Sequence, residues 1–136
     1  MKYSKATDYA LHTMLFLALG EREGRVGVGP LAERMQVSPT YLSKILTKLV
    51  KDGLVESSPG VSGGYRLRRS AGDIALLDII QAIEGKTSLY ECSGVHHHPG
   101  CLIHQAMAEA EHRMEAHLAS VTIADLARQQ EQRALS

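Results

Sequence analysis

The sequence has no tryptophan, one phenylalanine and only two cysteines among 136 residues, and its formal net charge is zero. Two cysteines are too few to cross-link a small secreted scaffold, so we expect a reducing, cytoplasmic setting in which the thiols are ligands, sensors or bystanders. The longest apolar run, residues 10–19, is interrupted and too short to span a bilayer, so no membrane partner is expected. What is present, 44% hydrophobic residues with balanced charge, favours one globular domain with or without an appendage.

The zero net charge conceals an uneven distribution of charged residues. Residues 1–72 hold 11 Lys and Arg against 6 acids, a net of +5. Residues 73–136 hold 4 Lys and Arg against 9 acids, a net of −5. This asymmetry favours a basic half that faces a polyanion, and the alternative is two solvated faces of one domain.

Hydrophobic spacing predicts helices in the first half of the chain. A first amphipathic helix is expected over residues 5–19, followed by a polar, glycine-rich loop over residues 20–29. Pro30 is typical of the first turn of a second, short helix, which breaks at residues 36–37.

A third helix is predicted directly after this break. Ser38 and Pro39 are typical of an N-cap and a first helical position, and Gly53 is expected to end the helix. Two short helices joined by a tight turn, the second of them basic, are typical of a helix-turn-helix.

A β-hairpin is predicted next, with alternating segments at 54–58 and 65–69 around a glycine-rich loop. A hairpin after a recognition helix is the wing of a winged helix. Asp73 is expected to cap a fourth helix that buries against the first, and Gly85 to close it.

The last third of the chain predicts an irregular loop and then a long helix. Residues 86–101 contain both cysteines and show no periodic pattern, whereas a capping box at Thr122 and Asp125 predicts a short last helix. The expected fold is mainly α with a small β-hairpin wing: a winged helix-turn-helix domain at 1–85, a Cys/His sensor loop at 86–101, and a dimerisation helix and tail at 102–136. The long helix carries apolar residues in alternating steps of four and three, which suits packing along a second copy, at Ile103, Met107, Ala110, Met114, His117 and Val121.

The recognition helix and the wing supply the candidate DNA contacts. Side chains at the start of a recognition helix reach base edges, lysines along its flank meet phosphates, and glycines let a wing backbone approach the duplex. The alternative for each lysine alone is a solvated helix face. The candidates are Ser38, Pro39, Thr40, Tyr41, Ser43, Lys44, Thr47 and Lys48 in the helix, and Ser62, Gly63, Gly64, Tyr65 and Arg66 in the wing.

Six segments follow one another along almost the whole chain: residues 9–11, 37–42, 49–55, 63–67, 79–85 and 122–126. Together they resemble the Rrf family of bacterial winged-helix transcription regulators, which includes iron-sulfur, nitric-oxide and cysteine-metabolism regulators. The resemblance implies a homodimer built on the long C-terminal helix, which binds a palindromic operator with two recognition helices and two wings. Pro59 and Ser43 stand where relatives carry a wing arginine and an acidic base-reading residue, so the operator sequence cannot be transferred.

The resemblance also implies a metal site. Cluster-binding relatives place three cysteines before the long helix, but this chain keeps only Cys92 and Cys101, too few for a tetrahedral metal. Asp8 and His12 lie four residues apart on one helical face. By the resemblance, these two residues of one chain and the two cysteines of its partner would hold a 2Fe-2S cluster, with His104 as a competing ligand.

Other functions stay open at this point. The sensor could hold zinc or another metal, act through thiol redox chemistry without metal, or sense nothing, and Asp8 and His12 could be ordinary surface side chains. The histidines at 96–98 could bind adventitious metal or form an exposed loop. We expect a sequence-specific DNA-binding regulator that represses transcription; a winged-helix protein-interaction module is the alternative. No catalytic motif predicts an enzyme.

Overall fold

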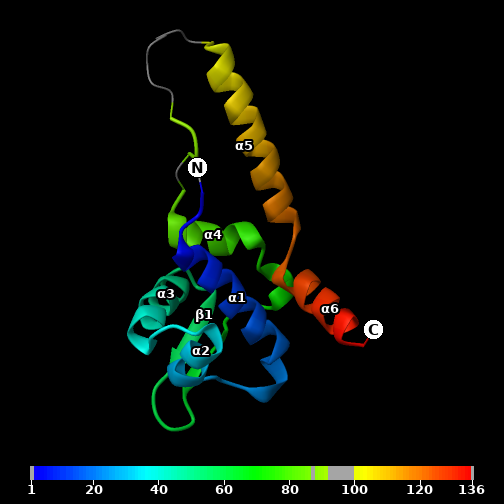
Figure 1. Cartoon of the computed structure of the whole chain (residues 1–136). Coiled ribbons are helices and arrows are strands. Elements are labelled where there is room, and N and C mark those ends of the chain that lie inside the picture. The colour runs from blue at the N-terminus through cyan, green and yellow to red at the C-terminus, as the bar shows by residue number, and fades with distance from the viewer. Residues whose placement is uncertain (1, 87, 92–99, 136) are drawn as a thin grey trace.

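The computed structural model of the protein describes residues 2–86, 88–91 and 100–135 (Figure 1). Within these ranges the chain is mainly helical with one antiparallel hairpin, as the sequence predicts. Short 3-10 turns lie at Glu21–Glu23 (η1) and Ala71–Asp73 (η2). The longer elements are α1 (Lys5–Leu19), α2 (Val28–Met35), α3 (Pro39–Lys51), β1 (Val55–Ser58), β2 (Gly64–Leu67), α4 (Leu76–Glu84), α5 (Leu102–Ser120) and α6 (Ile123–Ala134).

The hydrophobic core lies where α1, α3 and α4 meet. Met14 of α1, Leu46 of α3 and Ile79 of α4 are each 0% exposed. The buried stripe of α3 is the predicted one, so the opposite face of α3 is turned to solvent; the stripe consists of Leu42, Ile45, Leu46 and Leu49.

The long helix α5 runs away from the other helices, and the hairpin lies at the opposite end of the molecule (Figure 1). Along its own chain α5 packs against α4, whereas α6 turns back to pack against α1. None of the helices in the described ranges is long and apolar enough to cross a membrane.

The junction between α5 and α6 is joined to the segment before α4. The Ile123 N–H donates to the Ile74 carbonyl oxygen at 2.8 Å, and the Leu76 N–H donates to the Val121 carbonyl oxygen at 2.9 Å. Ile123 and Ile74 are also fully buried. The end of α5 is therefore fixed to the core.

Several predicted helix boundaries are confirmed. The break after α2 lies at Gln36, which adopts a left-handed φ of 59°, and Gly53 follows α3 with a φ of 75°. The Asp125 N–H donates to the Thr122 hydroxyl at 3.1 Å, and the Thr122 N–H donates to the Asp125 carboxylate at 3.0 Å, which forms the predicted capping box.

One predicted helix start is confirmed and one is wrong. Pro30 lies in the first turn of the second helix, which begins at Val28, and a proline is tolerated there because its missing N–H has no helical acceptor. Asp73 does not cap the fourth helix. The pairing with the α5–α6 junction keeps the chain extended through Ala75, whose N–H then donates to the Asp78 carboxylate at 2.9 Å.

The predicted hairpin forms with a shorter second strand. Val55 pairs with Leu67 and Ser58 pairs with Gly64, so β2 ends at Leu67, short of the predicted Arg69. This register places Val55 and Leu67 in the core and turns the side chains of the neighbouring pair, Glu56 and Arg66, to the opposite face.

The start of α1 is held by a carboxylate at the end of α4. Glu84 accepts hydrogen bonds from the Thr7 hydroxyl at 2.6 Å and the Ser4 N–H at 2.7 Å. These bonds, the Thr7 bond first, lower the pKa of Glu84 below its ordinary value. The charged carboxylate therefore favours the folded state.

We expect Glu84→Gln to lower the free energy of unfolding at pH 7 by about 1 kcal/mol, because two hydrogen bonds to a charged acceptor become bonds to a neutral one. A lowered folded-state pKa contributes stability above the unfolded value of about 4.3, and this contribution is lost as the pH falls through the folded-state pKa. Urea unfolding of both proteins should therefore converge at acid pH. Glu109→Gln, which removes a carboxylate from an exposed pair with Arg113, is the control and should change little.

Candidate nucleic-acid interface and sensor residues

The outer face of α3 presents most of the predicted base-reading and phosphate-binding side chains to solvent. The Ser38 hydroxyl caps the helix by accepting the Tyr41 N–H at 3.1 Å, which fixes the first turn. Ser43 is half-buried. The exposed members of the set are Ser38, Pro39, Thr40, Tyr41, Lys44, Thr47 and Lys48.

Two of these side chains make contacts within the protein. The Thr47 hydroxyl donates to the Ser43 carbonyl oxygen at 2.8 Å, so only its lone pairs remain for an incoming donor. The Tyr41 ring meets the Tyr9 ring of α1 edge to face, with centroids 5.9 Å apart. The first turn of α3 is therefore in direct contact with α1.

Gly63 and Gly64 of the wing lie so close to other backbone atoms that a side chain would clash there, a reason for glycine that sequence reasoning missed. A Cβ at Gly63 would lie 2.0 Å from the Ser58 carbonyl oxygen, and a Cβ at Gly64, where φ is +124°, would lie 2.6 Å from the Val26 carbonyl oxygen. The hairpin is held there by Tyr65, whose N–H donates to the Val26 carbonyl at 2.8 Å. No local pattern links Val26 to the wing, so the sequence offered no signal for this contact.

A carboxylate faces the predicted wing arginine. Glu56 stands opposite Arg66 in the hairpin register, and the Arg66 Nε–H donates to its Oε1. The Arg25 Nη2 lies 3.5 Å from the same oxygen. The hydrogen bond from Arg66 holds the pKa of Glu56 below its ordinary value. Sequence reasoning missed Glu56, although the alternation of the two strands could have placed it beside Arg66.

Asp8 and His12 lie side by side on α1, as their spacing predicts. The His12 Nδ1 is 3.3 Å from the Asp8 Oδ1 and 2.9 Å from the Asp8 carbonyl oxygen, and both side chains are more than half exposed. They line a groove of about 440 Å³ that also includes Phe16, Arg34 and Gln130. Two side chains of types that can ligate a metal are thus adjacent and exposed.

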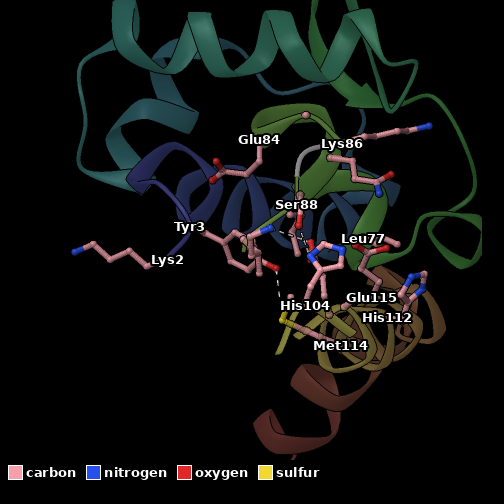
Figure 2. A pocket seen from close by; sticks show the side chains of 16 residues that line it. Lys2, Tyr3, Leu77, Glu84, Lys86, Ser88, His104, His112, Met114 and Glu115 are labelled. Atoms are coloured by element: carbon pink, nitrogen blue, oxygen red, sulfur yellow. Dashed lines mark hydrogen bonds between the residues drawn. The ribbon is translucent and has the colours of Figure 1, made fainter. Parts of the chain in front are cut away.

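Cys101 and His104 lie at the start of α5. His104 lines a separate pocket of about 560 Å³ between the N-terminal segment, α4 and α5, whose side chains Figure 2 shows. Tyr3 lies in this pocket with its hydroxyl 3.9 Å from the Met114 sulfur, and burial, then the neighbouring Glu84, raise its pKa.

The described part of the chain does not bring Asp8 and His12 into one pocket with His104. Asp8 and His12 line one pocket and His104 another. Cys92 and the histidines at 96–98 lie outside the described residues. Among the residues that are described, no group of three or more His, Cys, Asp or Glu side chains could hold a metal.

Comparison with known proteins gives a consistent result. Residues 3–129 match the Rrf2 family model, described as iron-dependent transcriptional regulator. The chain is 33% identical over 134 residues to the HTH-type transcriptional regulator IscR of Xenorhabdus nematophila, which covers 96% of this chain and 82% of that protein.

Solved structures agree with the sequence comparison. The IscR structure from T. potens matches with a TM-score of 0.81 and 31% identity, covering 98% of this chain and 90% of that one. The structure of CymR, the global cysteine regulator of B. subtilis, matches with a TM-score of 0.80 and 30% identity, covering 94% and 97%.

Proposed function

Because this chain belongs to the Rrf2 family and is a DNA-binding regulator of transcription, we propose that it acts in the cytoplasm as a homodimeric repressor. Each copy places α3 and its hairpin on one half of a palindromic operator. Two-fold related recognition helices suit half-sites one helical turn apart, about 34–36 Å.

The solvent exposure of α5 is the observation that supports a homodimer. No residue of this helix, all of which is described, is buried in the single chain. Leu102 is 78% exposed and Ile103 is 62% exposed. A helix of this length with an uncovered apolar side is stabilised by a partner helix, and a second copy supplies one with the same pattern.

The proposed DNA contacts divide between base edges and backbone. Thr40 and Tyr41, in the first turn of α3, are exposed and reach base edges, while Lys44 and Lys48 meet phosphates. The wing adds Ser62 and Arg66 with the glycine backbone between them.

These DNA contacts are tested on a duplex that the protein selects from a random-sequence library, because the selection identifies its operator. We expect Lys44→Ala and Lys48→Ala each to weaken binding several-fold and to reduce the slope of log Kd against log salt by about one. Fluorescence anisotropy across a salt series measures both quantities. Arg113→Ala, which removes one positive charge from exposed α5, is the control. Unchanged binding in both lysine variants would remove α3 from the interface.

Sensing is proposed to involve a 2Fe-2S cluster shared between the copies. Asp8 and His12 of one copy and Cys92 and Cys101 of the other would hold it, with His104 competing for the position of His12. The adjacency and exposure of Asp8 and His12 support this ligand set. When bound, such a cluster supplies reversible one-electron redox chemistry at a site with mixed thiolate and N/O ligands.

A route from this site to the DNA passes through Tyr9. It lies on α1 between the two proposed ligands, and its ring contacts Tyr41 in the first turn of α3. A shift of α1 on loss of the cluster would therefore displace the first turn of the recognition helix α3.

The cluster is tested by anaerobic purification and reconstitution with iron and sulfide, followed by an absorption spectrum and metal analysis. We expect a coloured protein, and colour loss in Cys101→Ser and Asp8→Ala but not in the control His117→Ala. A colourless protein would contradict the cluster. In that case, bound zinc would support a zinc-responsive regulator, and oxidation-dependent DNA binding without metal would support a thiol sensor.

A further inference from the structure

The base of the wing carries an anion between two cations. Glu56 and Arg66 occupy directly opposed positions on β1 and β2, on the face turned away from the core. Arg25 approaches the same carboxylate from the loop that pairs with the hairpin. One negative charge therefore stands between two guanidinium groups.

These three side chains differ in how easily they can move. Arg66 is 52% exposed, whereas Glu56 is 33% and Arg25 is 29% exposed. The Nε atom of Arg25 is also buried. Arg66 is thus the partner that can leave the cluster, while Glu56 remains beside the wing.

We propose that Glu56 is an intramolecular competitor of the DNA backbone for Arg66. In the protein without DNA the Glu56 carboxylate is paired with the Arg66 guanidinium, and a DNA phosphate must replace this carboxylate when the wing contacts the duplex. An exposed ion pair is worth little, so this exchange is accessible, but the carboxylate left behind repels the phosphate that has arrived. The inference rests on the proposed function in one respect, since it requires the wing to contact DNA.

Competition of this kind has two consequences that a base-reading or purely structural role lacks. Phosphates are present in every duplex, so Glu56 should weaken binding to the selected operator and to an unrelated duplex alike. Its effect should also depend on Arg66, because an anion that competes for a side chain has little to compete for once that side chain is removed.

The experiment compares Glu56→Gln, Arg66→Gln and the double variant on both duplexes across a salt series. We expect Glu56→Gln to lower Kd by about threefold to tenfold at low salt, and this gain to shrink as the salt concentration rises, because salt screens the attraction and repulsion that the carboxylate exerts. In the Arg66→Gln background the same substitution should change Kd by less than twofold, which is our threshold for coupling. Glu23→Gln is the matched control, an exposed acid of η1 with no ion pair in the described part of the chain.

The outcomes separate this inference from the proposed function. If the unmodified protein binds no duplex, both are contradicted. If it binds, and Glu56→Gln binds equally or more weakly, only the competitor role is overturned. An equal gain in Glu23→Gln, or an undiminished gain without Arg66, also overturns it by showing a general charge effect. Thermal unfolding checks each variant, and Glu56→Thr, which suits a strand, replaces Glu56→Gln if the latter does not fold.

Discussion

Ile103→Glu combined with Ala110→Glu should produce a folded monomer whose affinity for the full operator is lower by about a hundredfold or more. Both side chains are exposed on α5 in the single chain, so the substitutions leave its own core intact. In the proposed dimer they would place glutamates of the two copies in one apolar seam. Binding by one half-site alone loses the gain of simultaneous engagement, which is typically 10² to 10⁴.

Analytical ultracentrifugation and anisotropy on the selected duplex measure the two parts of this prediction, and circular dichroism checks the fold. Gln105→Glu is the control, because it adds one glutamate, against two in the double variant, at an exposed position of α5 away from the stripe. A variant that stays dimeric would place the interface elsewhere. A monomer that binds the full operator with undiminished affinity would contradict the need for two copies.

Gly64→Ala should give the second large effect, a loss of about 2–4 kcal/mol in the free energy of unfolding together with weaker DNA binding. A left-handed backbone conformation costs an L-residue about 1–2 kcal/mol, and the new Cβ would also lie 2.6 Å from the Val26 carbonyl oxygen. Relief of this clash requires the hairpin to part from Val26, which would displace the wing.

Gly60→Ala separates these two causes. Gly60 also has a positive φ, of +95°, but a Cβ there would meet nothing within 4 Å. We expect it to cost only about 1–2 kcal/mol, the backbone part of the penalty. Urea unfolding of the two variants measures the difference. Equal costs would mean that the Val26 contact does not constrain the wing.

Local signals predicted the helices of the DNA-binding half well, because their ends are set by nearby residues. Ser38 and Gly53 act within one turn of α3, and its apolar stripe follows from periodicity alone. Asp73 failed because a pairing with the distant α5–α6 junction decides where α4 begins. A capping residue cannot start a helix in a segment that tertiary hydrogen bonds hold extended.

The site was predictable in its residue types but not in its contacts. The adjacency of Asp8 and His12 follows from helical spacing, whereas the meeting of Tyr9 with Tyr41 depends on how α1 crosses α3. The pairing of Glu56 with Arg66 depends on the hairpin register. The DNA contacts and the metal ligands stay predictions, since both depend on a second molecule.

The junction between α5 and α6 is hydrogen-bonded to the core, so a rotation of the long helix about Val121 and Ile123 displaces its far end most. Its 19 residues span about 28 Å at 1.5 Å per residue. A tilt of α5 by about 5° about this junction therefore moves its Cys101 end by about 2.5 Å, whereas the core beside Ile74 barely moves. Conversely, a displacement of about 2.5 Å imposed at the Cys101 end corresponds to a rotation of only about 5° at the junction, so a sensor placed there would act on the DNA-binding half as a small rotation.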